Sequence, residues 1–471
     1  MSERKSSLQI NRVGKATIYY TASSIFARGV NFIFTPIYTR LMSQSELGIY
    51  SLYLSFLSIF TVITTFEMHG SVSYRALSRY KSAGFIKTAT LTEGAVMLFF
   101  LLIYILFSSR INAISALSTS LFLIMFLSIF LNTVESFILS KARYEGKYVK
   151  VSFINILSGA MNALLTLLLV SNMQNKANAR IASALIISLL IVPILFFKEA
   201  RRETKEGASY SRELSRYLIL SSVPLLIHFL FTSILANTDK ILVYRLLGEK
   251  EAGEYSVAHT VSFIFLALMQ GLISALTPWL IKNREKKRDI LPELFGTVLF
   301  VAIIAMLLFE TALPELFLFI GGKANADALA SAYPLQGGVV MLLMSSLFSA
   351  LSLCYTKRFV ILSSLVSSLF FIILSPPLIL RFGKLGASTA SLLGYTAFFI
   401  LSAIAFKKST GFFPIERKML AKCALIFSLI SPLPLLFRAS LPSRLLLALA
   451  SLALLFSHSQ KIKKILLTKG G

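Results

Sequence analysis

Charged residues are scarce in this sequence, and acidic residues are the scarcer sign. Asp, Glu, Lys and Arg make up 14% of its 471 residues, whereas soluble domains average about 25%. The 21 Asp and Glu stand against 47 Lys and Arg, which gives a formal net charge of +26. Together with 56% hydrophobic residues and a mean hydropathy of +0.76, this composition excludes an ordinary soluble domain.

Cysteine and histidine are also rare. The two cysteines, Cys354 and Cys423, both lie in apolar sequence and offer no disulfide framework. The four histidines are scattered, without the spacing of metal ligands or of a nucleophile and its base. We therefore expect neither a cofactor nor a metal site, and no catalytic residues.

Long polar segments are missing as well. The longest connection between apolar runs is about 20 residues, which is too short to fold as a separate catalytic domain. Apolar runs of roughly 16 to 29 residues recur from Ile18 to Phe456, long enough to cross a hydrocarbon core about 30 Å thick. They are rich in Leu, Ile and Phe and do not alternate with period two, which predicts helices rather than barrel strands. The expected fold class is an all-α polytopic membrane protein.

The apolar runs predict about fourteen transmembrane helices. The spans are 16–38, 47–68, 88–108, 114–139, 151–171, 181–197, 217–244, 253–281, 293–313, 334–356, 359–380, 386–406, 419–437 and 445–460. An even number of spans puts both termini on one side of the membrane.

Basic residues alternate from one side of the predicted spans to the other. Lys and Arg on the side of the N-terminus outnumber those on the opposite side by roughly three to one, which predicts that both termini are cytoplasmic. Three more, Arg28, Lys240 and Lys422, fall inside spans. We expect the densest cytoplasmic runs, 198–216 and 282–288, to contact lipid head groups rather than nucleic acid.

One segment of the chain is repeated. Residues 40–51 reappear at 245–256 with matching Arg, Leu, Glu, Gly, Tyr and Ser. An even number of spans separates the copies, so they share one orientation, as in the parallel repeats of several transporters. The repeat predicts a six-helix lobe at 1–200, a basic cytoplasmic linker at 201–216 and a second six-helix lobe at 217–406. Two additional helices and a basic tail follow at 407–471. A duplication without a transport role is the alternative.

The first span carries a polar face. Its members are spaced three and four residues apart, which places them on one side of a helix: Thr17, Thr21, Ser24, Arg28, Asn31 and Thr35. A cation near mid-span costs several kcal/mol unless it faces water, a counter-ion or a ligand. We interpret this face as the wall of a water-filled cavity, with an Arg28 paired inside the bundle as the alternative.

Polar residues also concentrate on the spans at 217–244 and 253–281, which correspond to the first two spans in the repeat. This concentration predicts a substrate cavity between the lobes, lined by Arg28, Asn31, Ser24, Thr21, Thr35, Asp239, Lys240, Asn237, His228, Gln270 and Thr260. Because its fixed charge includes Arg28 and Lys240, we expect an anionic cargo, and phosphate suits a guanidinium fork. The candidate coupling carboxylates are Asp239, Glu310 and Glu67.

Three segments resemble the signatures of a known family. Residues 237–258 resemble the seventh and eighth helices of polysaccharide flippases, and residues 40–50 are similar to their first helix–loop–helix. Residues 383–388 resemble the glycine-rich start of their twelfth helix. Over roughly residues 10–406 the chain is therefore similar to Wzx-type O-antigen and exopolysaccharide flippases. These belong to the multidrug/oligosaccharidyl-lipid/polysaccharide (MOP) exporter superfamily.

The resemblance implies alternating access of two six-helix lobes in the bacterial cytoplasmic (inner) membrane. It implies a cargo of undecaprenyl-diphosphate-linked oligosaccharide, with Arg28 in position to accept the diphosphate. Implied partners are this lipid-linked oligosaccharide, membrane lipids and other polysaccharide assembly proteins, but no nucleic acid. The last two spans resemble those of fourteen-span members and lipid II flippases, where the extra pair is associated with a lipid-tail groove. In this chain we expect Lys422 to be their only buried charge.

Two other functions stay open at this point. A cation-coupled multidrug exporter of the same superfamily would need membrane carboxylates and an acidic cavity, which a central Arg28 opposes. A membrane polysaccharide polymerase or acyltransferase would need a catalytic group near a membrane interface, usually on a substantial loop. The scattered histidines and the duplicated architecture oppose that function.

Overall fold

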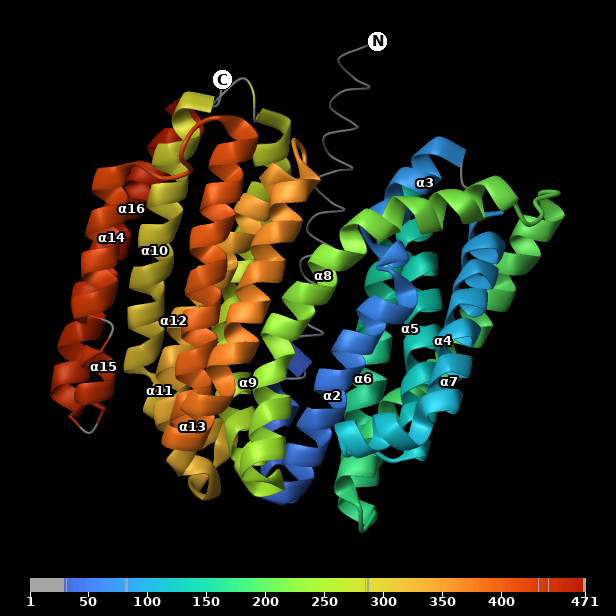
Figure 1. Cartoon of the computed structure of the whole chain (residues 1–471), viewed down its shortest axis with the longest axis horizontal. Helices are drawn as coiled ribbons and strands as arrows, with labels where there is room; N and C mark the ends of the chain where they lie inside the picture. The colour runs from blue at the N-terminus through green and yellow to red at the C-terminus, as the bar shows by residue number, and fades with distance from the viewer. Residues whose placement is uncertain are drawn as a thin grey trace. The chain divides into compact units, whose positions relative to one another are not determined.

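The computed structural model describes residues 29–30, 32–80, 84–283, 285, 288–430, 432–438 and 440–468. The chain divides into two compact units, which we call unit 1 (Met1–Leu230) and unit 2 (Phe231–Gly471). The division falls within one helix, α8, and each unit is described by itself. In Figure 1, unit 1 runs from blue to green and unit 2 from green to red.

Unit 1 is helical throughout its described residues, apart from short connections. Residues 32–41 are helical. The elements that follow are α2 (Gln44–Thr65), a π-helical turn (Met68–Val72), α3 (Ser73–Tyr80), α4 (Phe85–Ser115), α5 (Thr119–Tyr144), α6 (Tyr148–Asn172), α7 (Lys176–Lys205) and the first part of α8 (Arg212–Leu247). The predicted linker at 201–216 is therefore mostly helix, with only residues 206–211 outside α7 and α8.

Unit 2 takes the rest of α8 and the helices that follow. They are α9 (Glu249–Asn283), α10 (Leu291–Thr311), α11 (Leu313–Gly321), α12 (Leu329–Ser352), α13 (Lys357–Thr410), α14 (Arg417–Ile430), α15 (Leu433–Leu436) and α16 (Leu441–Thr468). Two 3₁₀ turns, Arg288–Ile290 and Lys323–Ala328, precede α10 and α12.

Eleven helices within the described residues are long and apolar enough to cross a membrane. One of them, α13, holds two predicted spans and breaks at Gly383, whose φ of 60° and ψ of −138° favour glycine. Residues 441–456 form a shorter apolar helix. Every predicted span from 47–68 onward overlaps a helix, while the span at 16–38 lies mostly outside the described residues. The prediction of an all-helical polytopic fold is confirmed.

The core of unit 2 is aromatic. The ring of Phe295 on α10 packs edge-on against Phe348 of α12 and Phe406 of α13, with centroids 5.2 and 5.8 Å apart. Edge-to-face pairs of this kind add to the stabilisation from apolar burial alone. The contacts of α12 with both α9 and α13 make it the central helix of this core.

The start of α2 shows why the repeated segment forms a helix there. Ser43 accepts a hydrogen bond from the Glu46 backbone amide, and the Glu46 carboxylate accepts one from the Ser43 amide. This reciprocal capping box satisfies two of the free amides of the first turn. The second oxygen of Glu46 accepts the backbone N–H of Lys176 at 2.9 Å, which ties the start of α2 to the start of α7.

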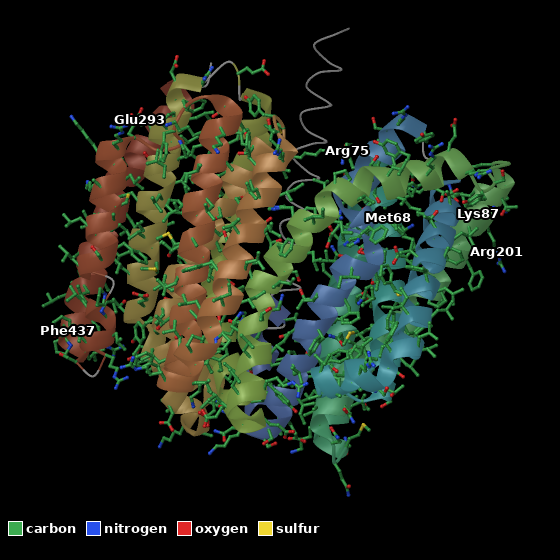
Figure 2. The ribbon with its side chains drawn as sticks, viewed as in Figure 1. Met68, Arg75, Lys87, Arg201, Glu293 and Phe437 are labelled. Carbon is green, nitrogen blue, oxygen red and sulfur yellow. The ribbon has the colours of Figure 1, made fainter. Side chains whose placement is uncertain are left out.

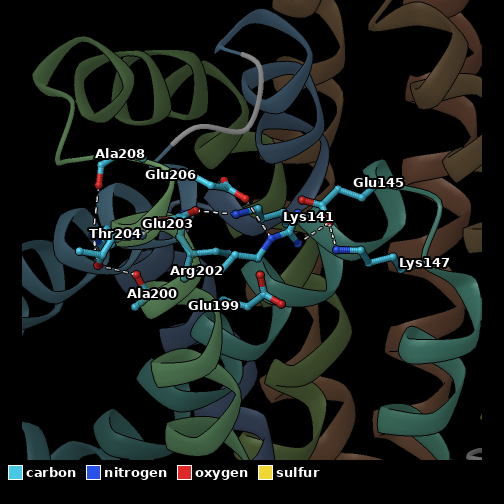
Figure 3. A network of polar contacts seen from close by, with 12 residues as sticks. Lys141, Glu145, Lys147, Glu199, Ala200, Arg202, Glu203, Thr204, Glu206 and Ala208 are labelled. Carbon is cyan, nitrogen blue, oxygen red and sulfur yellow. Dashed lines mark hydrogen bonds and ion pairs between the residues drawn. The ribbon is translucent and has the colours of Figure 1, made fainter.

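A buried ion pair joins three helix ends in unit 1 (Figure 3). Lys141 Nζ of α5 lies 2.7 Å from Glu203 Oε1 of α7, with side-chain exposures of 4% and 0%. The same carboxylate accepts the backbone N–H groups of Ile86 and Lys87 at 2.9 and 3.1 Å. Glu203 therefore caps the N-terminus of α4, where a negative charge is favourable. Lys150 of α6 pairs with Glu199, one turn earlier on α7.

Glu145 extends this pairing outside the membrane spans. Partial burial alone would raise the pKa of Glu145, but the hydrogen bond from Lys147 and the charges of Lys147 and Arg202 outweigh it. The pKa of Glu145 therefore lies below its usual value, and the carboxyl is ionised at neutral pH.

Among the side chains of the last helices that the structure describes, the buried charge is Arg444, not Lys422 as predicted. Lys422 is exposed, with its Nζ 4.7 Å from the ring centroid of Phe300. The Arg444 side chain on α16 is 7% exposed and donates two hydrogen bonds of 2.6 Å to Glu315 of α11. A third, of 2.8 Å, goes to the Thr311 carbonyl. Hydropathy placed Arg444 in a loop because it precedes the apolar run.

Candidate functional site

The carboxylate of Asp239 is the centre of a polar cluster in unit 2. Asp239 lies on α8 and is 1% exposed. One oxygen accepts the hydroxyl of Tyr255 at 2.8 Å and that of Ser391 at 3.2 Å, and the other accepts the backbone N–H of Lys240 at 2.8 Å. Three donors thus satisfy a carboxylate inside an apolar bundle, which would otherwise be very costly to bury. We call Asn237, Asp239, Lys240, Tyr255 and Ser391 the Asp239 cluster.

The cation of this cluster contacts a neighbouring amide. Lys240 Nζ donates to Asn237 Oδ1 at 3.1 Å, and Asn237 Nδ2 donates to the Ser233 carbonyl at 2.9 Å. Three predicted site residues, Asn237, Asp239 and Lys240, are therefore brought together on one helix. An adjacent buried anion and half-buried cation can hold a polar ligand, because membrane bundles rarely keep such groups for packing alone.

A second charged contact joins two of the three resemblance segments, 237–258 and 383–388. Lys384 Nζ pairs with Glu254 and lies 2.7 Å from Glu251 Oε2. Gly383 positions this lysine by breaking α13 immediately before it. Gly386 lets the two parts of α13 approach closely, because a Cβ at that residue would overlap the Leu378 carbonyl. The resemblance to flippases identified both segments, but the contact between Lys384 and the two glutamates was not predicted.

The other predicted residues of α8 and α9 are not members of this cluster. His228 belongs to unit 1, where it is 5% exposed and its ring centroid lies 5.5 Å from that of Phe229. Thr260 is exposed and donates to the Ser256 carbonyl of its own helix at 2.8 Å. Gln270 is half-buried. Within the described part of unit 2, no hydrogen bond joins Thr260 or Gln270 to Asp239.

Most residues of the predicted polar face of the first span lie outside the part of the chain that the structure describes. Thr21, Ser24, Arg28 and Asn31 lie outside the described residues, and Thr35 is half-buried in the helix at 32–41. The role of this face, with Arg28 at its centre, stays a prediction.

The candidate coupling carboxylates have three different surroundings. Asp239 has three donors. Glu67 is a quarter exposed, with Oε2 3.6 Å from His69 Nε2, and adopts a left-handed φ of 56° at the end of α2. Glu310 of α10 is 1% exposed, and its Oε2 has no hydrogen-bond partner among the described residues.

One buried carboxyl that has no hydrogen-bond partner among the described residues was not predicted from the sequence. Glu93 of α4 is 0% exposed, and neither of its oxygens has a hydrogen-bond partner among the described residues. Unpaired buried polar groups are rare and often functional. Its position inside an apolar run was the available signal, since an ionisable residue within a span is a candidate functional residue.

Known proteins resemble this chain in sequence and in fold. Residues 13–284 match the family described as "Polysaccharide biosynthesis protein". A relative from Haloferax volcanii, "Probable low-salt glycan biosynthesis flippase Agl15", is 22% identical over 415 residues, which are 83% of this chain and 83% of the relative.

Two solved structures share the fold. "Lipid II flippase MurJ, inward closed conformation" has a TM-score of 0.66 at 15% identity and covers 93% of this chain and 98% of its own. An inward-facing "multidrug resistance MATE family transporter of the MOP superfamily" has a TM-score of 0.56 at 11% identity, covering 88% and 99%. The matched family spans more than half of the chain, and the shared fold agrees with the predicted superfamily. The chain belongs to the polysaccharide biosynthesis protein family and has the polytopic fold of the MOP superfamily.

Proposed function

We propose that this protein is a flippase that moves an undecaprenyl-diphosphate-linked oligosaccharide from the inner to the outer leaflet of the bacterial cytoplasmic membrane. The product would serve surface polysaccharide biosynthesis. Family membership and the flippase names of the similar proteins support the class of cargo. We further propose that the two units are the predicted repeat halves, that they alternate access, and that both termini are cytoplasmic.

The observation that carries the proposal is the Asp239 cluster. An apolar span would be more stable with an aliphatic residue in place of each ionisable group. The chain instead keeps Asp239 buried with three donors, and Lys240 beside it with an amide partner. In a transporter, such groups bind a polar cargo or respond to it.

The proposed mechanism gives Arg28 the task of binding the diphosphate. Arg28 and the other residues of its predicted face would accept the diphosphate while the prenyl chain stays in lipid. A guanidinium matches two phosphate oxygens at once, so Arg28→Lys should retain part of the activity and Arg28→Ala almost none. Export of an anion is favoured by an inside-negative potential, at about 2.3 kcal/mol per charge per 100 mV.

The test is mass spectrometry of prenyl-diphosphate lipids from cells with and without the protein, alongside an assay of the surface polymer. We expect complete oligosaccharide-lipid to accumulate, and polymer to be lost, without the protein. Wild type should restore both, whereas Arg28→Ala and Asp239→Asn should not. The matched control is Arg110→Ala, an exposed cation of α4 that should complement like wild type.

Two results would contradict the proposal. Unchanged lipid pools with raised sensitivity to cationic drugs would favour the multidrug exporter. Accumulation of incomplete oligosaccharide or of unpolymerised surface product would favour a polymerase or acyltransferase. Membrane abundance of each variant separates loss of transport from loss of the protein.

A further inference from the structure

The C-terminal part of α7 carries a groove of its own in unit 1. Its volume is roughly 640 Å³, and it is lined by Ile194, Phe197, Lys198, Arg201, Arg202 and Lys205. These residues follow one another three and four apart, with two neighbouring pairs, so they share one face of the helix. We call this groove the basic groove.

Three of the four cations of the basic groove form no ion pair or hydrogen bond with the described residues. Arg202 donates to Glu145 and Glu206, as Figure 3 shows. For Lys198, Arg201 and Lys205, no hydrogen bond or ion pair joins them to any described residue, and all three are exposed. Figure 2 shows Arg201 at the outside of unit 1.

The acidic residues of the same helix point elsewhere. Glu199 and Glu203 are buried on the other side of α7, where Lys150 and Lys141 neutralise them. The helix therefore separates its charges into an inner face of satisfied carboxylates and an outer face of cations, of which Arg202 alone is paired with described residues. Such a separation leaves the groove strongly positive and complementary to an anion.

Apolar side chains border the cations on the side toward the membrane. Ile194 and Phe197 are 70% and 59% exposed. Ile194 lies one turn before Lys198 and Phe197 directly before it, where the predicted span ends. Exposed apolar residues continue along the helix through Leu190, Leu189 and Ile186. A ligand seated here meets cations at head-group depth and hydrocarbon-compatible side chains directly below them. That combination fits a lipid and does not fit a nucleic acid or a free phosphate.

The length of the cation row indicates the head group. From Lys198 to Lys205 the helix rises roughly 10 Å, which is longer than one phosphate contacted by a single guanidinium fork. We propose that the basic groove binds an anionic phospholipid whose head group carries two phosphates separated by a short linker, as in a diphosphatidylglycerol. Lys198 and Arg201 contact one phosphate and Lys205 contacts the other, while Arg202 keeps its pairs with Glu145 and Glu206. One acyl chain lies along Ile194 and Phe197.

The experiment is native mass spectrometry of the full chain after reconstitution into vesicles of phosphatidylethanolamine and phosphatidylglycerol, with and without diphosphatidylglycerol. Wild type is expected to retain diphosphatidylglycerol in preference to phosphatidylglycerol. The triple variant Lys198→Gln, Arg201→Gln, Lys205→Gln should lose at least about tenfold in occupancy, because it removes the three cations that attract the two phosphates. Arg202 is left unchanged, so that the inner network stays intact.

The matched control removes the same charge elsewhere. Lys407, Arg417 and Lys418 are exposed and are predicted to lie on the same side of the membrane. Their triple Gln variant should retain the lipid like wild type. Equal loss in both triple variants, or wild-type occupancy in the groove variant, would overturn the proposal. Equal binding of phosphatidylglycerol would overturn the two-phosphate assignment, and retention of a prenyl diphosphate instead would overturn the phospholipid. This measurement needs no transport, so its outcome is independent of the proposed function.

Discussion

Lys384 reaches Glu251 across unit 2, with Nζ 2.7 Å from Oε2, and the sequence repeat matches Glu251 with Glu46. Glu46 in turn accepts the backbone N–H of Lys176 at 2.9 Å in unit 1. In both units, a glutamate near the start of one span therefore contacts a lysine at the start of a later one. The repeated segment is therefore matched by a repeated contact in the structure. Both lysines lie outside the repeated segment, so the repeat did not predict their part in the contact.

Removal of the Lys384 ammonium should destabilise unit 2. Glu254 would keep its charge at 4% side-chain exposure without a cation, and an unsatisfied buried charged group costs about 2 kcal/mol or more. We expect Lys384→Gln to lower the thermal unfolding midpoint in detergent. Lys357→Gln, at an exposed lysine of the same helix, should change stability by less than about 0.5 kcal/mol. Equal midpoints for both variants would contradict this assignment.

Substitutions in the buried Lys141–Glu203 pair should lower the stability of unit 1 far more than substitutions in the exposed pairs of Arg202. Lys141→Met leaves a fully buried carboxylate with only two amide donors, and breaking a buried pair costs about 3–5 kcal/mol. The double variant Lys141→Met, Glu203→Gln should recover part of that loss. Arg202→Gln, which breaks exposed pairs, should cost less than about 1 kcal/mol. Denaturation followed by size-exclusion fluorescence can rank the three, and a double variant weaker than the single would refute the pairing.

Gly386→Ala tests the close approach within α13. The added methyl would overlap the Leu378 carbonyl, so the two parts of α13 must separate, at a cost of at least about 2 kcal/mol. Gly271→Ala is the control, because its Cβ would meet nothing within 4 Å. That substitution should be neutral or stabilise by up to about 1 kcal/mol. Expression level and unfolding midpoint report both, and a stable Gly386→Ala variant would contradict the described packing.

Acid should weaken the contact between α11 and α16. The hydrogen bonds from Arg444 are the main reason that the pKa of Glu315 lies below its usual value. A carboxyl with a lowered folded-state pKa stabilises the protein above its unfolded pKa, and this contribution is lost as pH falls through the folded pKa. Glu315→Gln should therefore be less stable than wild type at pH 7, and this difference should shrink as the pH falls below about 4. Thermal midpoints of both proteins along an acid titration test this, and a difference that does not change with pH would refute it.

The two cysteines should differ in reactivity. Cys354 is exposed in the connection between α12 and α13, whereas Cys423 is 1% exposed in α14. A membrane-impermeant maleimide should label Cys354 in inside-out vesicles and not in intact cells, because this connection is predicted to be cytoplasmic. Cys354→Ser should abolish labelling, and Cys423→Ser should leave it unchanged. Labelling of intact cells would reverse the predicted orientation.

Hydropathy predicted the helices well because membrane spans must be long, apolar and internally hydrogen-bonded. It predicted their ends less well. The polar end of α7 continues to Lys205, eight residues beyond the predicted span, because Glu199 and Glu203 find cations on neighbouring helices. Such pairing depends on residues far away in the sequence, which a local average of hydropathy does not include.

The candidate site was predicted only in part, because some of its members are far from Asp239 in the sequence. Asp239 and Lys240 stood out as charges within a span, but the donors Tyr255 and Ser391 are ordinary residues until the fold brings them to the carboxylate. Arg444 was assigned to a loop because it precedes an apolar run, yet Glu315 holds it in a buried position. The sequence thus indicates a charged residue within an apolar span, but it does not indicate the residue that pairs with it.

The cap that Glu203 places on α4 also constrains the order of synthesis. Glu203 follows Lys141 by 62 residues and the capped amide of Ile86 by 117. At about 5–20 residues per second, the ribosome makes Lys141 roughly 3–12 s before its counter-charge and the start of α4 roughly 6–23 s before its cap. During that interval the nascent chain holds an uncompensated ammonium at the membrane surface. Fragments that end before α7 should therefore be substrates for membrane quality-control proteases, and α7 is the helix whose arrival neutralises Lys141.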